Sequence, residues 1–137
     1  MSLRIDHARG MTLMELMIAL AIVAILAALA YPSYRDSLMR GRRIDAIGSL
    51  LAVRVAQERW RANHTAYADL HELGYADTSA DGYYRLRVLE RSAAGFLAIA
   101  QPHADGPQRG DACGTYAVDQ HGPLLSNGYA DATCWRR

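Results

Sequence analysis

One carboxylate at the start of a long apolar run constrains this chain more than any other feature. Glu15 is followed by residues 16–34, which carry no charged side chain. A run of this length can span a bilayer as a helix, and an unpartnered charge inside such a segment is costly. The large aliphatic residues of the run together outweigh the cost of one Glu near its end, so we expect the segment to insert with Glu15 as a functional candidate.

Composition indicates a small domain carried by this segment. The 137 residues suit one domain of roughly 100 residues plus accessory segments. All 15 basic residues are Arg, but the formal net charge of +1 gives no general argument for a nucleic acid or another anionic partner. The sequence holds no nucleophile elbow and no Gly-rich phosphate loop, and Glu15 lies too deep in the apolar run to act as a general base. We therefore expect neither an enzyme nor a cofactor.

Three interpretations of the N-terminal segment compete. A cleaved signal peptide would end at Ala28-Leu29-Ala30, whose small side chains suit a signal peptidase, but its apolar run would be longer than usual and would contain a charge. A plain single-pass anchor leaves Gly10 and Glu15 unexplained. The third interpretation gives Gly10 and Glu15 a joint function. In each case the basic residues before the run predict a cytoplasmic N-terminus: Arg4, His7 and Arg9.

The run Gly10-Met11-Thr12-Leu13-Met14-Glu15 resembles the type IV pilin superfamily, whose precursors carry a short basic (class III) leader ending in Gly and have Glu as the fifth mature residue. The resemblance implies that prepilin peptidase cuts between Gly10 and Met11 and that the new Met11 amine is N-methylated. Met11 departs from the usual Phe. The implied fold is α+β, with one long N-terminal helix on a small antiparallel sheet of three to four strands and a disulfide-bounded C-terminal loop.

Cleavage after Gly10 would create the partner that Glu15 lacks. The new α-amine of Met11 would lie four residues, or one helical turn, from the carboxylate. In a filament whose apolar helices pack side by side, Glu15 of one subunit could accept the Met11 amine of its neighbour, and a neighbour shifted by one turn would leave both ions unpaired. We therefore expect Glu15 to set assembly and axial register.

Four segments are expected: a cleaved leader (1–10), a transmembrane and filament-core helix (11–34), an amphipathic helix (35–63) and a globular head (64–137). Pro32 predicts a kink in the helix. Two apolar rows follow, which suggests that one packs on the protein's own sheet and the other on neighbouring subunits, although a helix central to a soluble core is an alternative. The first row is Ile44, Ile47, Leu51 and Val55, and the second is Leu50, Val53 and Trp60. Arg40, Arg42 and Arg43 could touch lipid headgroups or form a solvated collar.

Strand signals cluster in the second half of the chain. Alternation over residues 83–90 and the short apolar stretch 96–100 predict a hairpin, and residues 115–118 predict a third strand. A fourth strand at 124–125 is weakly indicated. Cys113 and Cys134 fall in the part expected outside the cytoplasm, where a disulfide between them would contribute roughly 3 kcal/mol. The histidines (His64, His71, His103 and His121) lack ligand-like spacing, so no metal site is expected.

The resulting interpretation is a structural subunit of a type IV pilus. The segment from Asp111 to Thr115 and the Cys134-Trp135 ending resemble PilE-type minor pilins, which implies a minor subunit supporting adhesion, twitching motility or DNA uptake. Expected partners are other pilin subunits, prepilin peptidase and the assembly platform of the inner membrane, with the head periplasmic before assembly and extracellular afterwards. A pseudopilin of type II secretion is one alternative. A DNA-uptake pilin is the other, using Arg85, Arg87, Arg91, Arg109, Arg136 and Arg137.

Overall fold

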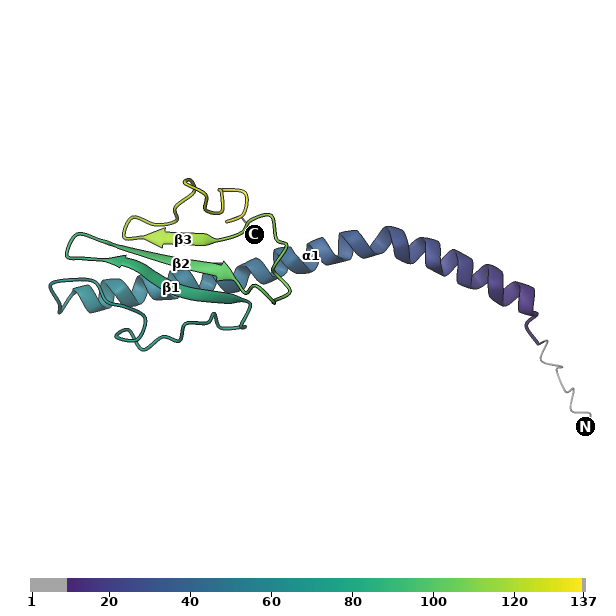
Figure 1. Cartoon of the computed structure of the whole chain (residues 1–137), viewed down its shortest axis with the longest axis horizontal. Helices are drawn as coiled ribbons and strands as arrows, with labels where there is room; N and C mark the ends of the chain where they lie inside the picture. Colours follow the sequence, from purple (N-terminus) through teal and green to yellow (C-terminus); the bar gives the residue numbers. More distant parts are fainter. Residues whose placement is uncertain (1–9, 137) are drawn as a thin grey trace, which may run out of the picture. The chain divides into compact units, whose positions relative to one another are not determined.

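A single long helix accounts for most of the first half of the chain. The computed structural model describes residues 10–136, and its helix α1 spans Leu13–Arg61 (Figure 1). The basic leader up to Arg9, and Arg137 at the other end, lie outside the described residues. Pro32 lies inside α1, where its missing N–H removes one backbone hydrogen bond. The kink expected there stays a prediction.

The chain divides into two compact units, Met1–Ser37 and Leu38–Arg137, and α1 contributes to both. Within residues 10–136, α1 is the one helix that is long and apolar enough to cross a membrane, judged by length and composition. Every described side chain of the first unit is exposed. The apolar residues of this unit therefore have no partner within the described part of their own chain.

The second unit contains a three-stranded antiparallel sheet in the order β1-β2-β3. The strands are β1 (Tyr84–Arg91), β2 (Phe96–Pro102) and β3 (Tyr116–Asp119), so each expected strand forms within two residues of its predicted ends. The expected fourth strand does not form. Leu124 donates its N–H to the Ala117 carbonyl and Asp119 donates its N–H to the Gly122 carbonyl, and these two hydrogen bonds flank one isolated bridge between Val118 and Pro123.

The inward-facing residues of the strands, spaced two apart, and those of α1, spaced three or four apart, form one hydrophobic core. Tyr84 and Leu86 point inward from β1, whereas Arg85 and Arg87 between them are exposed. The remaining buried members come from one face of the helix, from the two other strands and from the C-terminal segment: Ala46, Leu50, Val53, Phe96, Ala98, Ala100, Cys113, Tyr116, Val118, Ala130 and Cys134. The predicted α+β architecture, one long helix with a small antiparallel sheet, is confirmed.

Buried polar side chains on α1 hold the loops that flank the sheet. The Asp45 carboxylate accepts hydrogen bonds from the Ser79 hydroxyl (2.5 Å) and from the backbone N–H groups of Asp81 (2.9 Å) and Tyr83 (3.2 Å). Gln57 pairs through both of its amide atoms with the backbone of Ala68, at 2.7 and 2.9 Å. These contacts satisfy loop groups that would otherwise be buried without partners.

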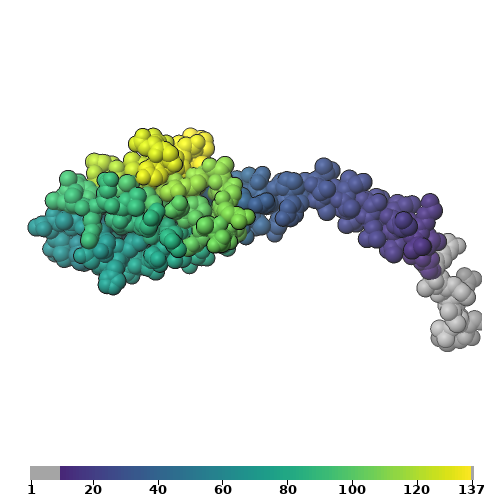
Figure 2. All heavy atoms as spheres, viewed as in Figure 1, coloured from purple at the N-terminus to yellow at the C-terminus, as the bar shows by residue number. Residues whose placement is uncertain are grey.

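The C-terminal segment is closed by the expected disulfide. Cys113 and Cys134 are bonded, with a Cα–Cα distance of 5.8 Å. Tyr116 donates its hydroxyl to the Cys134 carbonyl at 3.2 Å, which ties the end of the loop to β3. In Figure 2 these last residues, coloured yellow, form a raised part of the head's surface.

Candidate functional site

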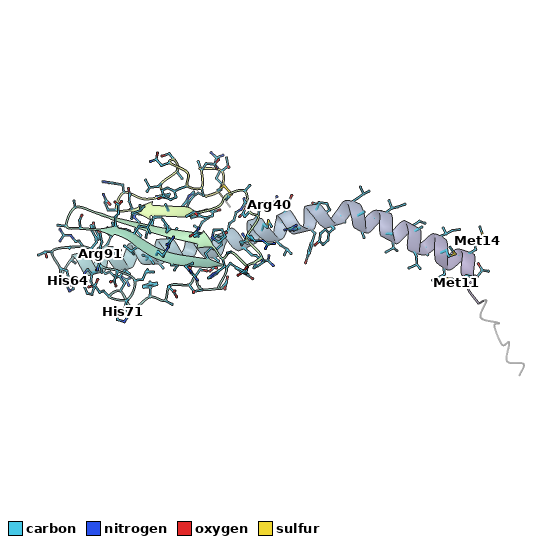
Figure 3. The ribbon with its side chains drawn as sticks, viewed as in Figure 1. Met11, Met14, Arg40, His64, His71 and Arg91 are labelled. Carbon is cyan, nitrogen blue, oxygen red and sulfur yellow. A yellow bond between two sulfur atoms is a disulfide. The ribbon has the colours of Figure 1, made fainter. Side chains whose placement is uncertain are left out.

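A capped helix start separates the expected cleavage site from α1. Thr12 accepts the Glu15 N–H on its side-chain oxygen (3.2 Å) and the Leu16 N–H on its carbonyl (3.1 Å), which is the geometry of an N-cap. Met11, labelled with Met14 in Figure 3, therefore precedes the helix in the uncleaved chain, and the spacing expected between its amine and Glu15 after cleavage stays a prediction. Glu15 occupies the first turn, where a negative charge suits the helix dipole.

Glu15 stands at the beginning of an exposed apolar surface. Leu13 and Leu29, near the two ends of this surface, are 76% and 74% exposed. Among residues 10–136, no basic side chain forms an ion pair with the Glu15 carboxylate. The segment thus combines a carboxylate that lacks a counter-ion with apolar side chains that need lipid or protein around them.

The later part of α1 presents its two apolar rows to different surroundings. Leu50 and Val53 are fully buried against the sheet, as predicted for one row. In the other row, Ile44, Leu51 and Val55 are 51%, 40% and 50% exposed, whereas Ile47 is partly buried against the core. The helix is therefore covered by its own sheet on one side only, and an apolar stripe is left open on the other.

The arginines suggested as one basic face are dispersed. Arg85 and Arg87 are exposed side by side on the outer face of β1. Arg91, labelled in Figure 3, is instead paired with Glu72 and Asp69, which neutralise it. Arg136 lines a separate cavity near the start of the second unit, Arg109 is exposed on a loop, and Arg137 lies outside the described residues.

A buried polar cluster that the sequence did not reveal lies under the connection between β2 and β3. Arg43 donates Nε (2.8 Å) and Nη2 (2.5 Å) to the two carboxylate oxygens of Asp111, and this hydrogen bonding raises the pKa of the guanidinium. Gln108 donates Nε2 to Asp111, to the Tyr84 hydroxyl and to the Met39 carbonyl. Arg43 and Asp111 are 68 positions apart in the sequence, so only the Asp-x-Cys spacing before Cys113 hinted at a role for Asp111.

His64 takes a structural position at the end of α1. His64 stacks on Trp60 with ring centroids 3.7 Å apart, and its Nδ1 lies 2.8 Å from the Trp60 carbonyl. Within the described range 10–136, no group of three or more His, Cys, Asp or Glu side chains is arranged to hold a metal ion. The two cysteines are bonded to each other.

Comparison with known proteins gives consistent matches along the chain. A family model described as "Type IV minor pilin ComP, DNA uptake sequence receptor" matches residues 32–117, and a prokaryotic N-terminal methylation motif matches residues 5–31. The type IV major pilin protein PilE1 of Neisseria gonorrhoeae is 35% identical over 100 residues, which cover 72% of this chain and 45% of that protein. The major pilin protein PilA of Myxococcus xanthus is 38% identical over 80 residues, covering 57% of this chain and 36% of that protein.

The fold is also that of solved pilins. The crystal structure of the Neisseria meningitidis non-core minor pilin PilV superposes with a TM-score of 0.53 at 17% identity, covering 70% of this chain and 96% of that one. The chain spans less than half of the length of the two curated relatives. Since the first family model covers more than half of the chain, and the exposed apolar helix and the sheet agree with it, the chain belongs to the type IV minor pilin family that this model describes.

Proposed function

We propose that this chain is a subunit, of the minor class, of a type IV pilus. One observation carries the proposal: the apolar first part of α1, residues 13–34, has only exposed side chains and carries near its start one carboxylate that has no counter-ion among residues 10–136. Such a surface needs lipid before assembly and neighbouring helices afterwards. The family match and the methylation motif support the same role.

Processing would supply the counter-ion. Prepilin peptidase would cut between Gly10 and Met11, and the Met11 amine, N-methylated or not, carries a positive charge. Thr12 caps α1 after this point, so the bond to be cut lies in non-helical backbone. In the filament, Glu15 of one subunit would pair with Met11 of the next, because leaving either ion unpaired in a dry core costs several kcal/mol.

Further elements of the subunit follow from the same proposal. The open stripe of Ile44, Leu51 and Val55 would pack on neighbouring subunits, and Pro32 would bend the helix between the two packing regions. Before assembly the chain would sit in the inner membrane with its N-terminus cytoplasmic and its head periplasmic. Its partners there would be the peptidase and the assembly platform, and its final location the extracellular pilus.

Filament incorporation tests the proposal directly. Glu15→Val is expected to abolish incorporation without affecting membrane insertion, whereas Asp36→Asn, which removes an exposed carboxylate further along the same helix, is the matched control. Gly10→Glu is expected to block processing, although a Cβ at Gly10 meets no atom within 4 Å. Mass spectrometry of sheared filaments would give the mature N-terminus, its methylation and the stoichiometry. Wild-type incorporation of Glu15→Val, or a chain beginning at Tyr31, would overturn the proposal.

DNA binding is a second candidate function, favoured by the wording of the family description and by two adjacent arginines. Arg85 and Arg87 are exposed on β1, and Arg87 donates to Gln101 at 3.1 Å, which holds its guanidinium over the sheet. Guanidinium groups on an open strand suit contacts with phosphates. Salt-sensitive binding of duplex DNA by the full chain in neutral detergent, weakened by R85Q/R87Q but not by R59Q, would support this function. Absence of binding at low salt would exclude it.

A further inference from the structure

The segment that follows β3 contains an Asn-Gly pair at the tip of a tight turn. Among residues 10–136, Asn127 is the only residue other than glycine with a positive φ, 62°, and Gly128 follows with a φ of 85°. The Tyr129 N–H donates to the Ser126 carbonyl at 3.3 Å. Two positive φ values enclosed by such a hydrogen bond are the pattern of a type I′ β-turn, in which Asn and Gly are favoured at the two central positions.

The polar groups of this turn are open to solvent. Ser126, Asn127 and Gly128 are all exposed. In the described part of the chain, neither the Asn127 side-chain amide nor the Gly128 N–H has a hydrogen-bond partner. A Cβ at Gly128 would meet no atom within 4 Å, so the space around the turn is open. A single hydrogen bond closes the turn, and local opening of such an exposed loop costs little free energy.

When the turn opens, the backbone can attack the side chain. Rotation about the Asn127 ψ angle brings the Gly128 nitrogen to the Asn127 Cγ, and the bond between them closes a five-membered ring. An amide nitrogen is a poor nucleophile because its lone pair is delocalised, but holding the two atoms in one small ring compensates for much of that disadvantage. Glycine has no Cβ to hinder the approach, which makes it the most permissive residue at the second position.

We propose that Asn127 is a site of spontaneous modification, at which the side-chain amide becomes a carboxylate without an enzyme. The Gly128 nitrogen loses its proton and bonds to the Asn127 Cγ, the Cγ–Nδ2 bond breaks, and the side-chain nitrogen leaves as ammonia. Water then opens the resulting cyclic imide. Opening at Cγ gives aspartate in a normal backbone, and opening at the main-chain carbonyl gives isoaspartate. The whole sequence consumes one water, releases one ammonia and requires no oxidant or reductant.

The modification changes both the charge and the backbone of the loop. One new carboxylate takes the formal net charge of the chain from +1 to neutral. Isoaspartate also adds a methylene group to the main chain, so the Tyr129 N–H no longer faces the Ser126 carbonyl in the geometry of a β-turn. The disulfide between Cys113 and Cys134 encloses the turn and keeps the modified segment attached at both ends. The reaction needs neither a membrane nor a filament, so it does not depend on the proposed function.

The test incubates the full folded chain in neutral detergent and mildly alkaline buffer over several days, followed by tryptic digestion and mass spectrometry. Trypsin places Asn127 in the peptide 110–136 and Asn63, the only other asparagine, in the peptide 62–85. Asn63 is also exposed but precedes His64, so it serves as the internal control. Asn127 is expected to exchange its NH₂ for OH, with isoaspartate detected by isoaspartyl methyltransferase, at least about tenfold faster than Asn63. An unmodified Asn127, or equal rates at the two asparagines, would overturn the proposal.

Two variants test the chemistry of the site. Asn127→Asp already carries the product carboxylate, so it is expected to release no ammonia from this position while still forming isoaspartate through the same imide. Asn127→Gln would have to close a six-membered ring, and we expect its ammonia release to fall about tenfold or more. Release by Asn127→Gln at the wild-type rate would overturn the proposal. Near-UV circular dichroism verifies that each variant is folded.

A parallel incubation in urea separates the folded turn from the unfolded chain. Deamidation of Asn127 in the folded chain at a measurable rate is expected, because the turn is exposed and held by one hydrogen bond. Modification that occurs only in urea would show that the folded turn protects Asn127 and would overturn the proposal.

Discussion

Replacing Asp111 by Asn tests the buried cluster that joins α1 to the C-terminal region. The wild-type carboxylate accepts two hydrogen bonds from Arg43, one from Gln108 (3.2 Å) and one from the Cys113 N–H (3.2 Å). Asn has nearly the same volume, but it replaces one acceptor oxygen by an NH₂ donor and removes the charge. A donor would then face the donors of Arg43.

The magnitude follows from the burial of the two partners. Breaking a buried ion pair costs about 3–5 kcal/mol when the remaining charge is left without compensation. The Asp111 side chain is 1% exposed, but that of Arg43 is 20% exposed, so water can take over part of the arginine's solvation. We therefore expect D111N to lower the free energy of unfolding by about 2–3 kcal/mol, a large share of the ~5–15 kcal/mol typical of a domain.

Urea denaturation of the full chain in neutral detergent, followed by near-UV circular dichroism, measures this loss. Asp105→Asn is the matched control, because Asp105 is an exposed aspartate on the same connection, and its replacement is expected to change stability by less than about 0.5 kcal/mol. A double-mutant cycle with Arg43→Met is expected to give a coupling of about 1.5–3 kcal/mol. Equal stabilities of D111N and D105N, or a coupling near zero, would refute the reasoning.

Three further predictions concern the C-terminal region. Replacing Cys113 and Cys134 by Ser is expected to lower stability by about 3 kcal/mol in urea denaturation, from the loop entropy of a disulfide that joins residues 21 apart; an unchanged midpoint would contradict it. Burial raises the pKa of Tyr116, so its neutral form stabilises the fold below about pH 10 and this contribution is lost at higher pH. The loss of stability with rising pH should therefore be less steep in Tyr116→Phe than in the wild type. Absorbance at 295 nm, which reports ionised tyrosine, follows this alkaline unfolding. Hydrogen bonding by the Thr133 hydroxyl, followed by backbone N–H groups, lowers the pKa of Asp131, so its contribution is present above about pH 4 and lost as pH falls through the lowered pKa. Asp131→Asn should remove that acid dependence, and an unaltered acid transition would argue against it.

Much of the fold could be predicted because its signals are local. The strand ends came within two residues of their predicted positions, since alternation is a property of neighbouring side chains. The helix begins at Leu13 because Thr12 acts as its cap. The weakly indicated fourth strand at 124–125 does not form, and only an isolated bridge joins Val118 to Pro123.

The candidate site was predictable only in its N-terminal part. Gly10, Met11 and Glu15 stand within six consecutive positions, so their spacing is visible in the sequence. The contacts of Asp45 with the loop around Ser79 were not visible, because they join residues 34 positions apart. The pairing of Arg91 with Glu72 and Asp69 was hidden for the same reason, and a count of arginines therefore overstated the basic face.

The sequence by itself determined that this chain has a helix able to cross a membrane, a single carboxylate at its start and two cysteines available for one disulfide. Hydropathy and helical spacing act within a segment and need no knowledge of the remaining chain. Only the tertiary structure decided which charged side chains form ion pairs and which lie beside a side chain of the same charge. Arg43 meets Asp111, and Arg136 comes beside Arg40, because the fold brings the C-terminal loop against α1. The energy of a charge depends on distance and burial, and both are set by the approach of residues remote in sequence.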